Sequence, residues 1–346
     1  AMLYRTGQLR KLGRVDHGSA AMDSHLLERE RGITIFLSQA ELPLGDMEVT
    51  LLDTPGHVDF SAEMERTLSV LDYAILVISG VDGVQAHTRT LWRLLELYRV
   101  PTFLFVTKMD FGRRDRDCLM ESLRHELGEG CVDFTPAARD RRMEQLATCR
   151  EDALEAYLDT GMVPEELVRQ LVRQRLVFPC WFGSGLKLEG IDEFLEGLAR
   201  YVEPPAYPAA FSARVFKISH DAQGKRLTHL KVTGGTLRVR DAISYGGRQE
   251  KAAQLRIYTG GRFRPVDQVP AGGICAVQGL TATWGGQGLG EREEAVRPVL
   301  EPVMRYRMAL PPDCDSRVLL PQLRQLEEED PMLRMVWDGE GKQIYV

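Results

Sequence analysis

The stretch Val49-Thr-Leu-Leu-Asp-Thr-Pro-Gly-His57 joins an apolar run to a turn that ends in a glycine and a histidine. The apolar run predicts a strand buried in a parallel sheet, with Asp53 at its carboxyl end. An aspartate in that position can hold Mg²⁺ through water. Gly56 lets a backbone N–H approach a terminal phosphate, because it carries no Cβ. The alternative is a strand that leaves its sheet through a proline turn capped by Asp53.

A second polar motif, Thr107-Lys-Met-Asp110, follows the apolar run 102–106. Asp110 can accept both N–H donors on the edge of guanine, which adenine does not offer, and the alkyl stem of Lys108 can lie over the base. Alone the motif is weak, because lysines at strand ends are usually just solvated. One strand and one helix separate it from Asp53, so we expect both aspartates at the carboxyl edge of one sheet, where open α/β folds bind ligands.

A third element, Gly183-Ser184-Gly185, follows a strand predicted at 176–181. Small residues there suit a loop whose backbone N–H meets the carbonyl group of a base. The same residues are equally compatible with an ordinary tight turn.

The hydrophobic pattern predicts three domains. Strands alternate with amphipathic helices from Ile33 to Tyr201, which indicates a doubly wound α/β fold with a mostly parallel sheet. Three prolines between Glu203 and Pro208 cannot continue a helix and mark a linker. Beyond it, short strands and glycine pairs indicate a closed antiparallel β-barrel. From about Pro311, a helix at 317–329 and two strand-like segments begin an α+β unit. The expected domains are 1–203, 204–300 and 301–346, and the expected strands include 49–52, 74–78, 102–106, 211–218, 227–232 and 273–277.

Composition restricts the class of protein. The chain has 346 residues, of which 44% are hydrophobic and 27% charged, as in ordinary globular proteins of two or three domains. It contains no apolar run of the roughly 20 residues that cross a bilayer and no secretory pattern, so we expect a soluble, cytoplasmic protein that binds no membrane. The net charge of −6 excludes a general nucleic-acid footprint. Six scattered cysteines suggest neither zinc nor disulfides, and Cys180 is expected in the core.

Together with Arg29-Glu-Arg-Gly-Ile-Thr34, the two aspartate motifs resemble those of the translational GTPases. The stretches Leu68–Asp72 and Asp82–Ala86 are similar to the tetracycline-resistance ribosomal protection proteins, which are relatives of elongation factor G. The similarity extends through Lys231–Thr236 to Asp330–Arg334 and so covers essentially the whole chain. It implies a P-loop GTPase-type domain, a β-barrel and the start of a ferredoxin-like α+β domain.

The resemblance also implies the ligands, GTP or GDP with Mg²⁺, and the roles of individual residues. Thr34 would close over the γ-phosphate, giving its hydroxyl to Mg²⁺, which Asp53 would also hold, and its backbone to the attacking water. His57 would be catalytic by positioning that water once the ribosome has placed it. Arg29 and Arg31 could touch phosphates or rRNA, or belong to a solvated loop. The implied GTP-binding residues are Asp53, Thr54, Pro55, Gly56, His57, Thr107, Lys108, Met109, Asp110, Ser184 and Gly185.

The sequence departs from the family pattern in three places. Thr107 stands where asparagine is usual, which predicts some loss of affinity but no loss of guanine preference. Gly185 replaces the usual alanine and only loosens its loop. No G-x-x-x-x-G-K-[ST] phosphate loop occurs. We expect it, with a central strand, upstream of Ala1, and further domains beyond Val346; alternatively, Ala1 is a cloning scar and the protein has little or no GTPase activity.

The resulting hypothesis is a monomeric, GTP-hydrolysing factor that binds ribosomal RNA and proteins and protects the ribosome from tetracycline. An elongation factor G-like translocase or a peptide-release GTPase is the alternative. The similarity at 68–89 favours protection, and so does the span of about 70 residues between Asp110 and Gly183, which leaves little room for an inserted subdomain. A non-enzymatic ribosome- or nucleotide-binding module remains possible if the phosphate loop is truly missing.

Overall fold

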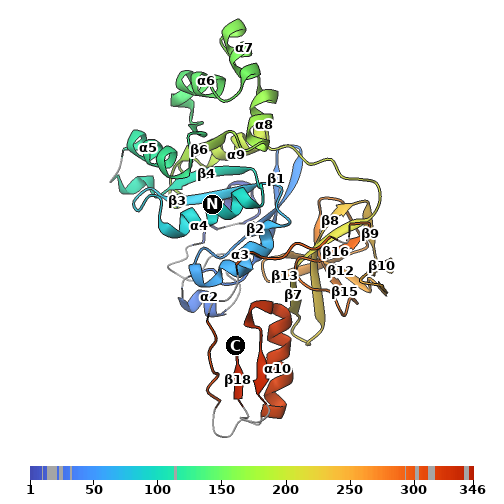
Figure 1. Ribbon diagram of the computed structural model, residues 1–346. Coiled ribbons are helices and arrows are strands. Elements are labelled where there is room, and N and C mark those ends of the chain that lie inside the picture. Colours follow the sequence, from blue (N-terminus) through green and yellow to red (C-terminus); the bar gives the residue numbers. More distant parts are fainter. Residues whose placement is uncertain are drawn as a thin grey trace. The chain divides into compact units, whose positions relative to one another are not determined.

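The computed structural model describes residues 1–9, 11–13, 22, 26–31, 33–112, 115–292, 294–300, 304–310, 316–338 and 343–346. Its elements, drawn in Figure 1, group into two compact units. The first unit consists of Ala1–Ile33, Ala40–Leu51 and Leu71–Pro205. The second unit consists of Thr34–Gln39, Leu52–Val70 and Ala206–Val346.

A four-stranded sheet in the order β3-β4-β6-β5 forms the centre of the first unit, and all its neighbouring strands are parallel. Helices alternate with the strands along the chain, which confirms the predicted doubly wound α/β fold. The strands are β3 (Ala74–Ser79), β4 (Thr102–Thr107), β5 (Cys131–Asp133) and β6 (Phe178–Phe182), and the helices are α4 (Ala86–Leu97), α5 (Arg116–Leu127), α6 (Arg139–Ala147), α7 (Glu151–Thr160), α8 (Glu165–Arg173) and α9 (Ile191–Tyr201).

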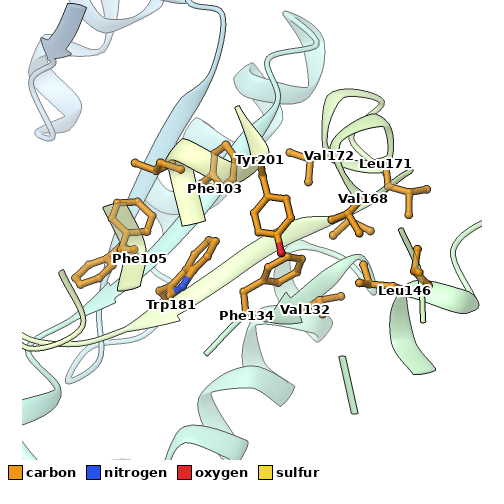
Figure 2. Packing of buried hydrophobic residues seen from close by; sticks show 14 of the residues in the cluster. Phe103, Phe105, Val132, Phe134, Leu146, Val168, Leu171, Val172, Trp181 and Tyr201 are labelled. Atoms are coloured by element: carbon orange, nitrogen blue, oxygen red, sulfur yellow. The ribbon is translucent and has the colours of Figure 1, made fainter. Parts of the chain in front are cut away.

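Both faces of this sheet are covered by helices, which explains the continuous apolar sequence of β4. Successive side chains of a strand point to opposite faces. Leu104 and Val106 belong to a buried cluster with α4 and α5. Phe103 and Phe105 belong to a second cluster, shown in Figure 2, which β5, β6, α6, α8 and α9 complete. Cys180 of β6 is fully buried in the first of these clusters, as predicted.

A strand is present at 49–52, as predicted. It was also predicted to belong to the parallel sheet, and this is wrong, because among the described strands it lies outside that sheet. It forms β2 (Met47–Asp53), whose one hydrogen-bonded neighbour among the described strands is β1 (Ser38–Leu44), across the turn at Gly45 and Asp46. A parallel neighbour would have to come from a strand that the described residues do not include. Every residue of β2 is therefore at least partly exposed. The remaining helices before Asp53 are α1 (Met2–Arg5) and α2 (Leu26–Arg31).

Short antiparallel strands build the barrel domain of the second unit, as the glycine pairs predict. Six of them form one sheet in the order β13-β12-β15-β8-β7-β16, and the pairs β10-β11 and β14-β9 help to enclose the same apolar core. Gly246 and Gly247 join β10 to β11 with φ of +53° and +73°, values that a two-residue hairpin of this twist requires. The strands are β7 (Ser212–His220), β8 (Arg226–Gly234), β9 (Thr236–Arg238), β10 (Ala242–Tyr245), β11 (Arg248–Lys251), β12 (Gln254–Thr259), β13 (Arg262–Val266), β14 (Gln268–Pro270), β15 (Ile274–Gln278) and β16 (Gly288–Gly290).

The last part of the chain also belongs to the second unit and contains the predicted helix and strands. Helix α10 (Ser316–Glu329) ends before Asp330, whose carboxylate accepts a hydrogen bond from the Met332 N–H at 3.2 Å and so caps the 3₁₀ helix η5 (Pro331–Leu333). Strands β17 (Val336–Asp338) and β18 (Gln343–Tyr345) pair antiparallel. The second unit further includes η2 (Val58–Phe60) and α3 (Ser61–Leu68). Among the described helices, none has the length and apolarity needed to cross a membrane.

Gly197 in the middle of α9 tests the packing in Figure 2, because a Cβ at this position would lie 2.2 Å from a ring carbon of Trp181. Alanine normally stabilises a helix interior by about 1 kcal/mol relative to glycine. We expect the opposite sign here, a loss of about 1–3 kcal/mol in the free energy of unfolding, because the Trp181 ring must move. Urea denaturation measures it. The exposed neighbour Glu196 supplies the control Glu196→Ala, and a Gly197→Ala variant as stable as that control would contradict the packing.

Candidate functional site

The turn after β4 places Asp110 close to the sheet. Lys108 adopts the left-handed conformation with φ of +61°, and Met109–Phe111 then form the short 3₁₀ helix η3. This change of direction separates the two side chains: Lys108 is exposed, whereas the side chain of Asp110 is only 10% exposed. The result is a nearly buried carboxylate beside a flexible, solvated cation.

The loop after β6 lies against this turn. Gly183 N–H donates to Val106 O at 2.9 Å, and Met109 N–H donates to Gly183 O at 3.0 Å. A Cβ on Gly183 would lie 2.0 Å from Glu189 O, so only glycine fits there. The structure therefore brings together two of the motifs that the sequence singled out, 107–110 and 183–185.

Within this loop the backbone donors are unequally engaged. Ser184 N–H donates to Glu189 O at 3.0 Å, and the Ser184 side chain is buried. Gly185 N–H makes only a long contact of 3.4 Å to the Thr107 hydroxyl. The Gly185 N–H is consequently a better candidate than the Ser184 N–H for a donor to a bound base. The contact of the Thr107 hydroxyl with this loop was not expected from the sequence.

Lys187 is a further residue that the sequence did not single out. Its ammonium group lies 4.0 Å from the Asp110 carboxylate, and its backbone N–H donates to the Ser184 hydroxyl at 3.2 Å. Lys187 therefore contacts both the turn at 107–110 and the loop at 183–185. In the sequence, only its position three residues after Ser184 could have indicated that Lys187 belongs to this loop.

The second unit carries the other predicted motif. Asp53 is the last residue of β2, Pro55 is buried, and Gly56 and His57 are exposed. A Cβ on Gly56 would meet no atom within 4 Å, so its backbone borders open space. The Nδ1 atom of His57 accepts a hydrogen bond from Asp59 N–H at 3.3 Å, which fixes the ring on that side and leaves Nε2 for another partner.

Helix α3 follows this motif directly and holds a buried carboxylate that the sequence analysis missed. Glu63 pairs with Lys217 of β7 at 2.6 Å and with Arg66 at 2.8 Å. Burial by itself would raise the pKa of Glu63, but the two cations outweigh it and lower the pKa to about 2. Only the helical spacing of charged and apolar residues at 61–68 could have indicated it.

The predicted site residues are thus divided between the two units. Thr34 and 53–57 belong to the second unit, whereas 107–110 and 184–185 belong to the first. The prediction that Asp53 and Asp110 follow strands of one sheet is wrong for the described strands, because β2 pairs with β1 alone. Gly32 and the side chain of Arg29 lie outside the described part of the chain. The roles of the individual residues stay predictions.

Comparisons with known proteins identify both domains. Residues 1–204 match the family model of the elongation factor Tu GTP binding domain, and residues 210–289 match that of elongation factor G domain 2. The chain is 36% identical to the oxytetracycline resistance protein of Streptomyces rimosus and 30% identical to the tetracycline resistance protein TetP of Clostridium perfringens, over 98% and 100% of its length. It spans 57% of the length of either relative. A crystal structure of a Thermus thermophilus protein superposes with a TM-score of 0.86 at 25% identity, covering 99% of this chain and 60% of that one.

The low pKa of Glu63 predicts how stability depends on pH. A carboxylate whose pKa falls from 4.5 to about 2 on folding stabilises the protein fully above pH 4.5, and this contribution is lost as the pH falls toward 2. We expect Glu63→Gln to lower the free energy of unfolding at pH 7 and to make it less dependent on pH below 4.5. Urea denaturation at several pH values measures both. Glu121→Gln, at an exposed glutamate, is the control. If the free energy of unfolding changed with pH in the same way in Glu63→Gln and wild type, the buried ion pair would be contradicted.

Proposed function

Because the chain belongs to the family of the elongation factor Tu GTP-binding domain, we propose that it hydrolyses GTP when the ribosome stimulates it. The family supports guanine-nucleotide binding and GTP hydrolysis in general. The observation that carries the proposal is the backbone contact between the turn at 107–110 and the loop at 183–185, made by Met109 N–H and Gly183 O. This contact joins the loop that carries Gly185 to the turn that carries Lys108 and Asp110, which supports a shared role of these residues in binding a base.

Each of these groups has a role in the proposed recognition of guanine. The Asp110 carboxylate accepts the two N–H groups on the guanine edge, a bidentate pairing that adenine cannot make. Gly185 N–H donates to the base carbonyl, and the stem of Lys108 covers one face of the base. Thr107 supports the loop through its contact with Gly185.

The residues proposed to bind phosphate and Mg²⁺ are Thr34, Asp53 and Gly56 of the second unit. A hydroxyl and a carboxylate are oxygen ligands of the kind that Mg²⁺ binds, so the residue types fit this ion. Both side chains are partly exposed within the second unit, which leaves them accessible. Bound Mg²⁺ would neutralise charge on the phosphates. Gly56 would offer its N–H to the terminal phosphate, because open space borders it.

His57 is the proposed positioning group for the attacking water. Asp59 engages Nδ1, so Nε2 is the atom that would hold the water. The side chain is 50% exposed, and the polar contacts of its Nδ1 atom are with Asp59, two residues away. A ribosome contact that orders this loop would therefore raise the rate, whereas turnover without the ribosome would be slow.

Replacing His57 by alanine in the full-length gene product tests the role of this residue. We expect the affinity for GTP and GDP to be unchanged within about twofold and ribosome-stimulated hydrolysis to fall by about 100-fold or more, because only the transition state uses the ring. Fluorescent nucleotide titration and phosphate release measure the two quantities. His125→Ala, an exposed histidine of α5, is the control. Normal turnover in His57→Ala would overturn the assignment.

The names of the relatives support protection against tetracycline as the role of the whole protein. Both relatives described above are named as resistance proteins, and the match covers essentially all of this chain. We therefore place the protein in the cytoplasm, acting as a monomer on ribosomal RNA and proteins. The proposed domains of the chain are 1–203, 204–300 and 301–346.

Translocation in the manner of elongation factor G is the second candidate function. The match of residues 210–289 to elongation factor G domain 2 favours it, because that barrel is named for the translocase. A peptide-release GTPase would use the same two domains. These alternatives share the GTPase chemistry and differ in what docking on the ribosome achieves.

Growth in tetracycline separates these candidates. We expect a susceptible strain that expresses the full-length gene to grow at tetracycline concentrations that stop the empty-vector strain, and His57→Ala to reduce this advantage. The minimal inhibitory concentration is the measurement, with an antibiotic that does not act on the ribosome as control. Unchanged sensitivity, with the protein present and hydrolysing GTP, would count against protection and favour translocation.

A further inference from the structure

Helix α3 links the proposed catalytic loop to the barrel through buried charge. The helix begins four residues after His57, with η2 between them. Its carboxylates are shielded from water: Glu65 is 0% exposed, and the side chain of Glu63 is 15% exposed. Buried charges are costly unless they are paired, so their partners determine where the helix can lie.

Three different segments of the second unit meet at Glu63. One carboxylate oxygen accepts from Lys217 Nζ of β7 at 2.6 Å and from Leu37 N–H at 3.4 Å, three residues after Thr34. The other oxygen accepts from Arg66 at 2.8 Å. The Lys217 ammonium also lies 5.8 Å from the centre of the Phe36 ring, on the same segment as Leu37. Glu63 therefore contacts the segment that contains Thr34 and the barrel at once.

A β-bulge on β7 places Lys217 for this contact. Val215 pairs with Leu230 and Lys217 with His229, so Phe216 is one extra residue on this strand. The Phe216 side chain is buried against Val70, at the end of the α3 segment. A bulge re-aims the next side chain, so the strand presents a lysine to α3 beside this apolar contact.

Two further side chains of α3 contact other segments of the second unit. The Glu65 carboxylate accepts from Val299 N–H at 2.6 Å and Leu300 N–H at 2.9 Å, on the segment that follows the barrel. Arg66 donates to Asp330 at 2.8 Å, the residue that caps η5. Every ionic group on this part of α3 is thus paired with another segment or with Glu63.

We propose that Glu63 is a positioning residue for GTP hydrolysis: through Lys217 it fixes α3, and with it the His57 loop and the Thr34 segment, to barrel strand β7. Movement of the barrel, for example on docking, then changes the placement of His57 without any direct contact to nucleotide. The inference rests on the proposed function. It goes beyond that function by making the barrel a determinant of the catalytic rate rather than only a docking surface.

The test uses the full-length gene product with Lys217→Met, Glu63→Gln and the double variant, and Lys225→Met as an exposed control lysine. We expect Lys217→Met to leave the Kd for GTP within about twofold and to lower ribosome-stimulated kcat by up to about 100-fold, since small displacements of catalytic groups have effects of this size. Amide hydrogen exchange at 35–37 should accelerate in Lys217→Met but not in Lys225→Met.

The double variant distinguishes positioning from a general loss of structure. Removing both charges leaves no unpaired charge on this pair, so we expect the double variant to fold even if a single variant does not. We also expect the fold loss of kcat in the double variant to be smaller than the product of the two single losses. Independent, multiplicative effects would overturn the proposal, and so would wild-type exchange at 35–37 in Lys217→Met. If wild type and Lys225→Met themselves fail to hydrolyse GTP on ribosomes, the proposed function is wrong. Hydrogen exchange would still show, in that case, whether the Glu63–Lys217 contact holds the Thr34 segment.

Discussion

Hydrogen bonds at Gly183 hold the turn after β4 against the loop after β6, and the candidate base site depends on them. Gly183 both donates to Val106 and accepts from Met109, so neither loop can move without breaking a backbone hydrogen bond. The absence of a side chain at Gly183 permits this approach, since a Cβ would collide with Glu189. A buried aromatic cluster that includes Phe105 of β4 and Trp181 of β6 packs against the strands from which these two loops begin (Figure 2).

In the second unit, paired charges hold the helix that follows the motif at 53–57. The segment from Thr54 to His57 is neither helix nor strand, and α3 behind it is fixed by carboxylates that the protein surrounds. Such contacts are strong only while both partners stay in place, because an unpaired buried charge is expensive. This property would suit the proposed GTPase, in which the His57 loop would adopt different arrangements before and after hydrolysis.

The two units hold their motifs in different ways, and each way matches the chemistry proposed for that motif. Recognition of a base requires a constant geometry, which a parallel sheet covered on both faces supplies. The proposed activation of a water molecule on the ribosome requires a response to docking, which a helix bound to the barrel by an ion pair would supply. The matches to a GTP-binding domain over 1–204 and to a barrel domain over 210–289 are consistent with that arrangement.

The sequence alone predicted most of the helices and strands, and it supplied the candidate site residues, whose roles stay predictions. Apolar runs of period two and 3.6 identified the strands, the helices and the barrel, because local patterning decides which face of an element is buried. It misplaced 49–52 in the parallel sheet, since pairing depends on which strands are available as neighbours. Only the tertiary structure revealed Glu63, Lys187 and Lys217. Their partners come from distant segments, and no local spacing encodes a contact such as that between α3 and a bulged strand more than 150 residues away.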